Sequence, residues 1–272
     1  SKIIDYSKLK FPVIMVQEYG WNLFRLGAQS QLALEETDKC ELRTNTTVTE
    51  IKDVRDQNLA HNWELQTKED LFKVKYLINS SGFRTGAFDD ALHLKAKRLV
   101  EFKASYVSKW ENPVGLIPEI IFHGERGTPH GMAQLTPYKG NHYQIHGMTE
   151  EITLFKNGLL EAKPGAMHPK FSDDIEIKLE TGWPIDETNE RTNSAISFVS
   201  EFIPSFKSAE VAGPPLYGAQ QIPGDDPSLR VGEVSFPMPS YARSEIIKAS
   251  SALTVANQII ENMQKETVID LI

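Results

Sequence analysis

The last quarter of the chain, from Leu229 to Met263, constrains the fold more than any other stretch. Residues 229–236 alternate apolar and polar side chains, which predicts a short strand. Residues 236–241 contain two prolines, and since proline lacks the backbone donor that a strand ladder needs, we expect a loop there. From Ala242 to Met263 apolar side chains recur at helical spacing. A loop that leads into a helix N-terminus can bind an anionic or polar ligand, although a helix that only packs on a sheet fits the same pattern.

Bulk composition narrows the class of protein. The 272 residues are enough for one large domain or two small ones. A formal net charge of -8 argues against nucleic acid or an anionic membrane as the main partner. The single cysteine, Cys40, excludes an intrachain disulfide and a cysteine metal cage, and fits a reducing compartment. No apolar run reaches membrane-spanning length and the N-terminus lacks a signal-peptide pattern, so we expect a cytoplasmic protein.

The first third of the chain predicts one helix and several strands. Asn22 is a plausible N-cap for a helix that ends near Glu36. Alternating patterns predict a strand over 46–54 and a hairpin of 63–67 with 71–76. Short strands are also expected at 11–16 and 40–44, and residues 76–79 form a strand that ends in Ser80-Ser81-Gly82.

The middle of the chain has a different sequence pattern, dominated by expected strands. Residues 99–107 alternate strictly, which predicts a strand with one side facing solvent. A further strand at 120–123, a hairpin around Lys139-Gly140 and a helix over 188–202 follow. We therefore expect a discontinuous domain, residues 1–95 with 206–272, interrupted by an antiparallel-sheet domain, residues 96–205. The fold class is α+β, derived from α/β.

Three segments carry a resemblance to a known group. They are Thr47-Val48-Thr49, Asn79-Ser80-Ser81-Gly82 and Val231-Gly232-Glu233. In this order they resemble segments of the D-amino acid oxidase, glycine oxidase and sarcosine oxidase group of FAD-dependent oxidoreductases. The resemblance implies that the Val48 backbone holds adenine, that Ser81 and Gly82 permit close approach to the cofactor, and that Glu233 contacts the ribityl chain. The implied cofactor-binding residues are Thr47, Val48, Ser81, Gly82, Gly232, Glu233, Ser240, Tyr241, Ala242 and Arg243.

The same resemblance implies a substrate pocket under the inserted sheet, with hydride transfer from a small C–H donor to flavin. Its expected residues are Tyr143, His146, Tyr217 and Gln220. Tyr143 and His146 should lie on opposite faces of their strand. Where the group carries a substrate-binding arginine, this chain has Gln220-Gln221, a departure that puts amino-acid substrates in doubt. Four histidines between residues 123 and 146 lack a carboxylate shell, so no metal site is expected.

The glycine-rich fingerprint of a nucleotide-binding βαβ unit, G-x-G-x-x-G, does not occur in the sequence. The chain therefore resembles the portion of a flavoprotein that follows its first nucleotide-binding half. We expect FAD to bind this fragment weakly or not at all, and a missing N-terminal nucleotide-binding half to be its partner. The alternative function is a non-catalytic β-rich binding or interaction protein derived from the same fold. No catalytic residue is assigned by the sequence.

Overall fold

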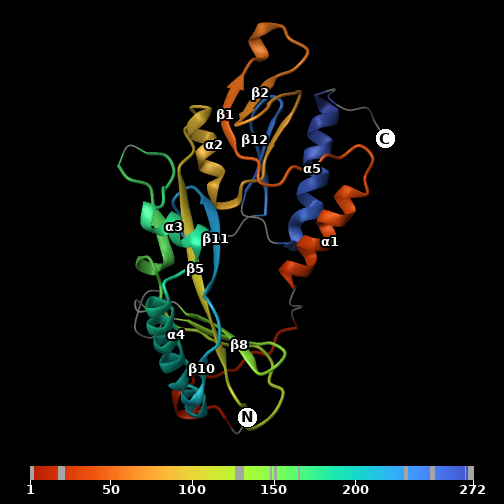
Figure 1. Cartoon of the computed structure of the whole chain (residues 1–272). Coiled ribbons are helices and arrows are strands. Elements are labelled where there is room, and N and C mark those ends of the chain that lie inside the picture. The colour runs from red at the N-terminus through yellow and green to blue at the C-terminus, as the bar shows by residue number, and fades with distance from the viewer. Residues whose placement is uncertain are drawn as a thin grey trace. The chain divides into compact units, whose positions relative to one another are not determined.

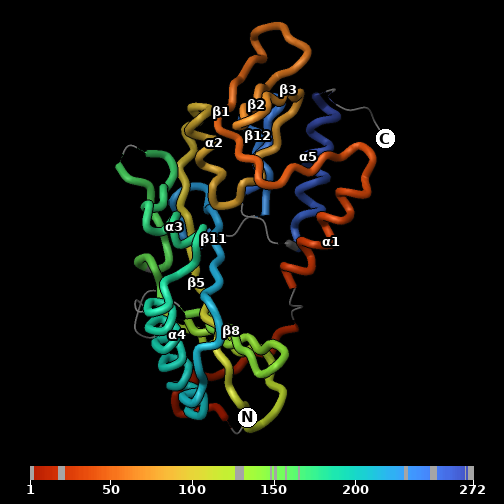
Figure 2. The backbone as a smooth tube through the Cα atoms, in the orientation of Figure 1, coloured from red at the N-terminus to blue at the C-terminus, as the bar shows by residue number. Residues whose placement is uncertain are grey.

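A computed structural model describes residues 3–17, 22–125, 132–147, 149, 152–164, 166–229, 232–245, 249–266 and 268. The chain divides into two compact units. The smaller spans Lys10–Val74, and the larger comprises Ser1–Leu9 with Lys75–Ile272. The trace of each unit can be followed in Figure 2.

The smaller unit contains one helix and a three-stranded antiparallel sheet. The helix is α1 (Leu23–Glu35), and the strands β1 (Val48–Asp53), β2 (Trp63–Thr67) and β3 (Leu71–Val74) lie in the order β1-β2-β3. The Asn22 side chain accepts a hydrogen bond of 2.9 Å from the Arg25 amide, which confirms the expected N-cap. The predicted helix and hairpin are confirmed. The strands predicted at 11–16 and 40–44 are wrong, because neither segment pairs with a neighbouring strand in the described chain.

A seven-stranded antiparallel sheet dominates the larger unit. Its path is β10 (Glu210–Val211), β5 (Arg98–Lys109), β8 (His142–Gly147), β7 (Ala133–Pro137) and β6 (Ile120–Phe122). Two further strands, β9 (Leu159–Glu161) and β11 (Leu216–Pro223), also pair with β5. The β11 pairing is the longest, from Leu216 opposite Ser105 to Pro223 opposite Arg98, and Figure 1 shows the two strands side by side. The predicted strand over 99–107 and the predicted hairpin are confirmed. The solvent-facing side expected for that strand is wrong, because Leu99, Glu101 and Ser105 are at most 9% exposed.

The two faces of β5 differ in character. Phe102, Ala104 and Tyr106 point to one face and are almost fully buried. Helix α4 (Ile185–Ser200), which confirms the helix predicted over 188–202, covers part of this face with Ala195, Ile196 and Val199. The intervening residues Glu101, Lys103 and Ser105 point to the opposite face, as alternation along a strand requires.

The closing segment forms a sheet with strand order β12-β13-β4. β12 (Val234–Met238) and β13 (Tyr241–Ser244) are antiparallel, and β13 runs parallel to β4 (Leu77–Asn79). The loop predicted over 236–241 is therefore reduced to a turn at Pro239 and Ser240, since β12 extends to Met238 and β13 begins at Tyr241. Pro237 is tolerated because β12 is an edge strand whose register shifts between Ser235 and Met238. The predicted helix start at Ala242 is wrong, since α5 (Ala252–Lys265) begins ten residues later.

The remaining elements are short. α2 spans Thr85–Ala91 and α3 spans Asp173–Thr181. The 3-10 helices are η1 (Tyr6–Lys8), η2 (Arg55–Gln57), η3 (Gly82–Arg84), η4 (Lys156–Gly158), η5 (Pro204–Ser208) and η6 (Ala249–Ser251).

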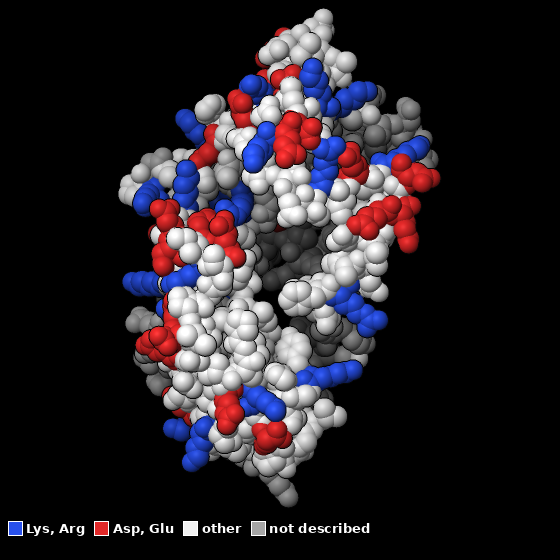
Figure 3. All heavy atoms as spheres, viewed as in Figure 1, with Lys and Arg blue, Asp and Glu red and all other residues white. Residues whose placement is uncertain are grey.

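The expected α+β class is confirmed, with antiparallel and mixed sheets. The division at residues 95 and 206 stays a prediction, although β11 from the second of these parts pairs with β5 from the insertion. Among the described residues no helix combines the length and the apolar character that crossing a bilayer requires. Basic and acidic side chains are interspersed over the face that Figure 3 shows.

Candidate functional site

One edge of the β12-β13-β4 sheet gathers several of the residues predicted to bind a cofactor. Because β4 and β13 are parallel, their carboxyl ends meet at one edge, where ligands bind in many α/β proteins. Ser80, which follows β4, lies there with its Oγ 3.0 Å from the Ser244 Oγ at the end of β13. Gly82 comes next with a φ of 59°, a left-handed conformation that favours glycine.

The start of β12 lies at the same edge. Val234 is opposite Ser244, and the Glu245 amide donates a hydrogen bond of 3.0 Å to the Glu233 carbonyl. The Glu233 side chain is exposed. The structure therefore brings together four of the predicted cofactor residues, which are Ser81, Gly82, Gly232 and Glu233.

The other predicted cofactor residues lie elsewhere. Ser240, Tyr241 and Ala242 are buried at the opposite end of β13, where the Ser240 amide donates a hydrogen bond of 2.6 Å to Glu266 Oε2. Burial raises the pKa of Tyr241 to about 12. Thr47 and Val48 belong to the smaller unit. A cofactor role for these residues stays a prediction, but the loop before a helix N-terminus that suggested it for residues 240–243 does not exist.

Arg243 belongs to a buried ionic cluster, which we define as Asp89, Arg98, Arg243 and Glu245. Arg243 Nη1 lies 2.7 Å from Asp89 Oδ1, and Arg98 Nε lies 2.7 Å from Asp89 Oδ2. Arg98 Nη1 lies 2.6 Å from Glu245 Oε2. Two cations thus face two carboxylates, and every one of the four residues is at most 8% exposed.

Neutral side chains complete the hydrogen bonding of this cluster. Gln221 Nε2 donates to Glu245 Oε2 over 2.8 Å, and Arg98 donates to the Gln221 Oε1. Ser235 Oγ donates to Glu245 Oε1 over 2.5 Å. Burial acts to raise the pKa of Glu245, but the hydrogen bonds and the charge of Arg98 outweigh it and lower that pKa. The cluster joins β5 and β11 of the large sheet to β12 and β13.

A second group of polar side chains lies on the face of the large sheet opposite to Phe102, Ala104 and Tyr106. We call it the polar face, and its members are Glu101, Lys103, Ser105, His146 and Gln220. Glu101 is fully buried, and its Oε2 accepts a hydrogen bond of 2.5 Å from Gln220 Nε2. Lys103 Nζ lies 3.3 Å from the same oxygen. Ser105 is directly opposite His146, whose Nδ1 lies 3.1 Å from the Ala104 carbonyl.

The four predicted substrate residues divide between the two faces of this sheet. His146 and Gln220 belong to the polar face, whereas Tyr143 and Tyr217 lie on the other side. Tyr143 is 4% exposed and packs against Trp110, with ring centroids 5.5 Å apart. Tyr217 stacks on Phe102 at 5.6 Å. The expectation that Tyr143 and His146 point in opposite directions is confirmed. Of these two residues of β8 only His146 belongs to the polar face, and of the two residues of β11 only Gln220 does.

Comparison with known proteins assigns the fold. No family model and no curated protein matches the sequence. Among solved structures, a glycine oxidase of Bacillus cereus matches with a TM-score of 0.50 at 13% identity, covering 85% of this chain and 52% of that chain. The chain has part of the FAD-dependent oxidoreductase fold. It spans about half the length of the oxidases that it matches.

Two further oxidases of this fold are similar over most of the chain. A glycine oxidase of Geobacillus kaustophilus has a TM-score of 0.49 at 12% identity, over 85% of this chain and 50% of that chain. A reduced L-α-glycerophosphate oxidase of Mycoplasma pneumoniae with FAD bound has a TM-score of 0.47 at 16% identity, over 90% and 54%.

The residues of this oxidase fold fit one part of FAD and not another. At the edge of β4 and β13, a Cβ on Gly82 would meet no atom within 4 Å, so a ligand has room to approach. The Ser80 and Ser244 hydroxyls and the exposed Glu233 carboxylate offer partners for the hydroxyls of a ribityl chain. The pyrophosphate lacks its usual cradle, since the sequence has no G-x-G-x-x-G.

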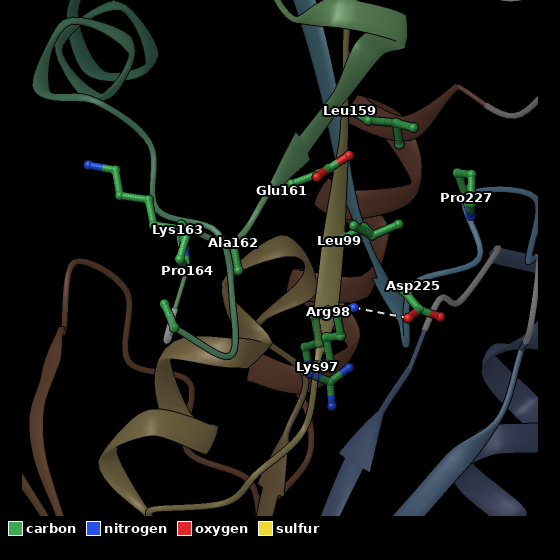
Figure 4. Close-up of a pocket in the computed structure, with 11 residues that line it drawn as sticks. Lys97, Arg98, Leu99, Leu159, Glu161, Ala162, Lys163, Pro164, Asp225 and Pro227 are labelled. Atoms are coloured by element: carbon green, nitrogen blue, oxygen red, sulfur yellow. Dashed lines mark hydrogen bonds and ion pairs between the residues drawn. The ribbon is translucent and has the colours of Figure 1, made fainter.

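A surface cavity of about 370 Å³ lies at the start of β5, where Arg98 of the buried ionic cluster contributes to its lining (Figure 4). Leu99, Leu159 and Pro227 give it apolar walls, and an ion pair of 2.9 Å joins Lys97 to Asp225. No predicted site residue lines this cavity. The described residues contain no group of acidic, histidine or cysteine side chains arranged to hold a metal ion.

Proposed function

We propose that the chain is the cofactor-distal, substrate-binding part of an FAD-dependent oxidoreductase that transfers a hydride from a small C–H donor. The observation that carries the proposal is the oxidase fold combined with a polar face on its large sheet. An ordinary covering sheet would have apolar side chains on that face, whereas here a lysine and an amide both contact one fully buried carboxylate.

Each group has a separate task in this proposal. Bound FAD supplies the electron acceptor, and the protein supplies orientation and charge around it. The polar face binds and orients the substrate, and Glu101 holds Lys103 and Gln220 in place. The edge residues Ser81, Gly82 and Glu233 bind the cofactor. A cytoplasmic location rests on the single exposed cysteine, Cys40.

We also infer that a nucleotide-binding half completes the site, in the same polypeptide or as a separate one. The sequence lacks a pyrophosphate cradle, and the smaller unit has many exposed apolar side chains. No side chain of α1 is buried. We call these side chains, which are 40–97% exposed, the apolar strip; they are Phe11, Val13, Ile14, Met15, Val16, Leu23, Phe24, Leu32 and Leu34. In this proposal they contact the nucleotide-binding half.

Flavin binding by the purified chain tests the proposal. FAD is added, the sample is dialysed, and the visible absorbance of retained flavin is measured. We expect little retention, and a weak, saturable quenching of FAD fluorescence before dialysis. Glu233→Gln should weaken that quenching severalfold, because a ribityl hydroxyl loses a charged acceptor. The control Glu201→Gln, at an exposed position after α4, should not.

Two results would count against parts of this proposal. Stoichiometric flavin after dialysis would show that no second half is needed. A complete lack of saturable quenching would remove the cofactor role of the sheet edge. It would favour the second candidate, a non-catalytic binding protein, which the missing glycine-rich fingerprint already supports.

A further inference from the structure

We propose that Lys103 and Ser105, on the polar face opposite Gly218, form a binding site for a small organic anion, a carboxylate or a phosphate. The inference rests on the proposed function, because it names the chemical class that the polar face takes. It assigns substrate binding to Lys103 on β5, whose neighbours on the polar side of β11, Gly218 and Gln220, carry no charge.

Lys103 supplies the positive charge of this site. Its side chain is 30% exposed, so the ammonium reaches solvent while the stem packs on the sheet. The fully buried Glu101 carboxylate holds the Lys103 ammonium in place, with Glu101 Oε2 3.3 Å from Lys103 Nζ. The same oxygen also accepts a hydrogen bond from the Gln220 amide, so its remaining capacity to attract a ligand cation is small. A lysine held in this way attracts anions as a point charge with three donors.

Ser105 supplies a hydrogen-bond donor beside that charge. It is the next residue on the same side of β5, about 7 Å from Lys103 along the strand. Its side chain lies in a position only 9% exposed. The Ser105 hydroxyl is not among the fully enclosed, unpaired polar atoms of the described residues, so it is accessible and can donate a hydrogen bond to a ligand oxygen.

Gly218 provides the space in which the anion sits. It is directly opposite Lys103 in the β5–β11 ladder, and a Cβ there would meet no heavy atom within 4 Å. Leu216, opposite Ser105 and 39% exposed, adds an apolar wall for the carbon part of a ligand. The Lys103 charge, the Ser105 donor, the open space at Gly218 and the apolar Leu216 side chain together fit a ligand with an anionic group on a short carbon chain.

Titration of the ¹⁵N-labelled full chain followed by NMR tests the site. Acetate and inorganic phosphate are added in separate arms at constant ionic strength, and acetamide serves as the neutral analogue of acetate. We expect the amide signals of Lys103, Ser105 and Gly218 to shift saturably in at least one anion arm and not with acetamide. The arm that saturates identifies the head group as carboxylate or phosphate.

Matched variants separate this site from general attraction of anions. Lys103→Gln should raise the dissociation constant at least tenfold, and Ser105→Ala should raise it severalfold. Lys109→Gln, an exposed lysine on the same strand and the same side, should leave it unchanged. Gly218→Val should block binding without any change of charge, and unshifted signals elsewhere in its spectrum confirm that it folds.

Shifts that do not saturate, or that Lys103→Gln and Lys109→Gln reduce equally, would overturn the proposal. Equal shifts with acetamide would also overturn it. The result is independent of flavin, since the titration contains none. Loss of anion binding with retained FAD quenching therefore counts against this site alone, and the reverse result counts against the cofactor edge alone.

Discussion

At the level of single residues, Arg98 connects three elements of the larger unit, and no sequence pattern predicts these contacts. It contacts Asp89 of α2, Gln221 of β11 and Glu245 after β13. Taking charges out of water is costly, and only mutual pairing and complete hydrogen bonding offset that cost. The buried ionic cluster meets this condition, so its members depend on one another.

Removal of Arg98 should therefore be severe. We expect Arg98→Met to lower the free energy of unfolding by about 3–5 kcal/mol, because two buried carboxylates, Asp89 and Glu245, then share Arg243 as the one remaining cation of the cluster. The neighbouring Lys97→Met is the matched control, since Lys97 pairs with Asp225 at the surface, with side chains 62% and 70% exposed. Urea unfolding measures both variants. Similar losses in the two variants would show that the buried ionic cluster does not stabilise the fold.

Sequence reasoning reached only part of this chemistry. It predicted His146 and Gln220 for the substrate side, and both lie on the polar face. Alternation over 99–107 predicted a strand with two different faces, which singles out Glu101, Lys103 and Ser105. The solvent-facing side that it also predicted is wrong, because Glu101 and Ser105 are buried. It could not find the cluster, because Arg98 and Glu245 are 147 residues apart and only the folded sheets bring them together.

At the level of elements, periodicity was reliable where neighbouring strands pair locally. The hairpin of β2 with β3 and that of β7 with β8 both follow the predicted spacing. It failed in the closing segment, where two prolines suggested a loop. An edge strand needs donors on one side only, and a register shift near Pro237 removes the conflict. Ser240 then turns the chain with a φ of 59°.

Two glycines in helices should respond in opposite ways to substitution by alanine, one with a gain and the other with a loss of stability. Gly27 lies inside α1, where a Cβ would meet nothing within 4 Å, so Gly27→Ala should stabilise the helix by about 0.5–1 kcal/mol. Gly86 lies in α2, where a Cβ would stand 2.3 Å from the His168 Cβ. Gly86→Ala should destabilise the larger unit by about 1–3 kcal/mol because the neighbouring chain must shift.

Circular dichroism during urea unfolding measures both glycine variants. A gain in stability for Gly86→Ala would mean that α2 is not packed against residue 168. A loss for Gly27→Ala would mean that the exposed side of α1 at that position is covered.

At the level of the whole molecule, the two units differ in how they bury apolar groups. The larger unit has a core of aromatic and aliphatic side chains between its large sheet and α4. In the smaller unit the buried hydrophobic residues are few, namely Ile51, Val54 and Trp63 among those described. The apolar strip adds nine exposed side chains to the same unit, which a stable free surface rarely carries.

The apolar strip should make the isolated chain self-associate. We expect Met15→Ser with Phe24→Ser, at 97% and 81% exposure, to reduce association and to lower binding of a hydrophobic dye. Ile185→Ser, at a single exposed position of 75% at the start of α4, is the control and should change neither. Sedimentation velocity measures association. An unchanged profile for the double variant would argue against a partner at this surface.

The pairing of β5 with β11 also determines when the large sheet can be completed during synthesis. β5 ends at Lys109 and β11 begins at Leu216, so at 5–20 residues per second the ribosome takes roughly 5–20 s to deliver the partner strand. During that interval β5 presents an unpaired edge over residues 98–105, which is a template for wrong strand pairing. A nascent chain of this protein therefore depends on protection of that edge until residue 223 has emerged.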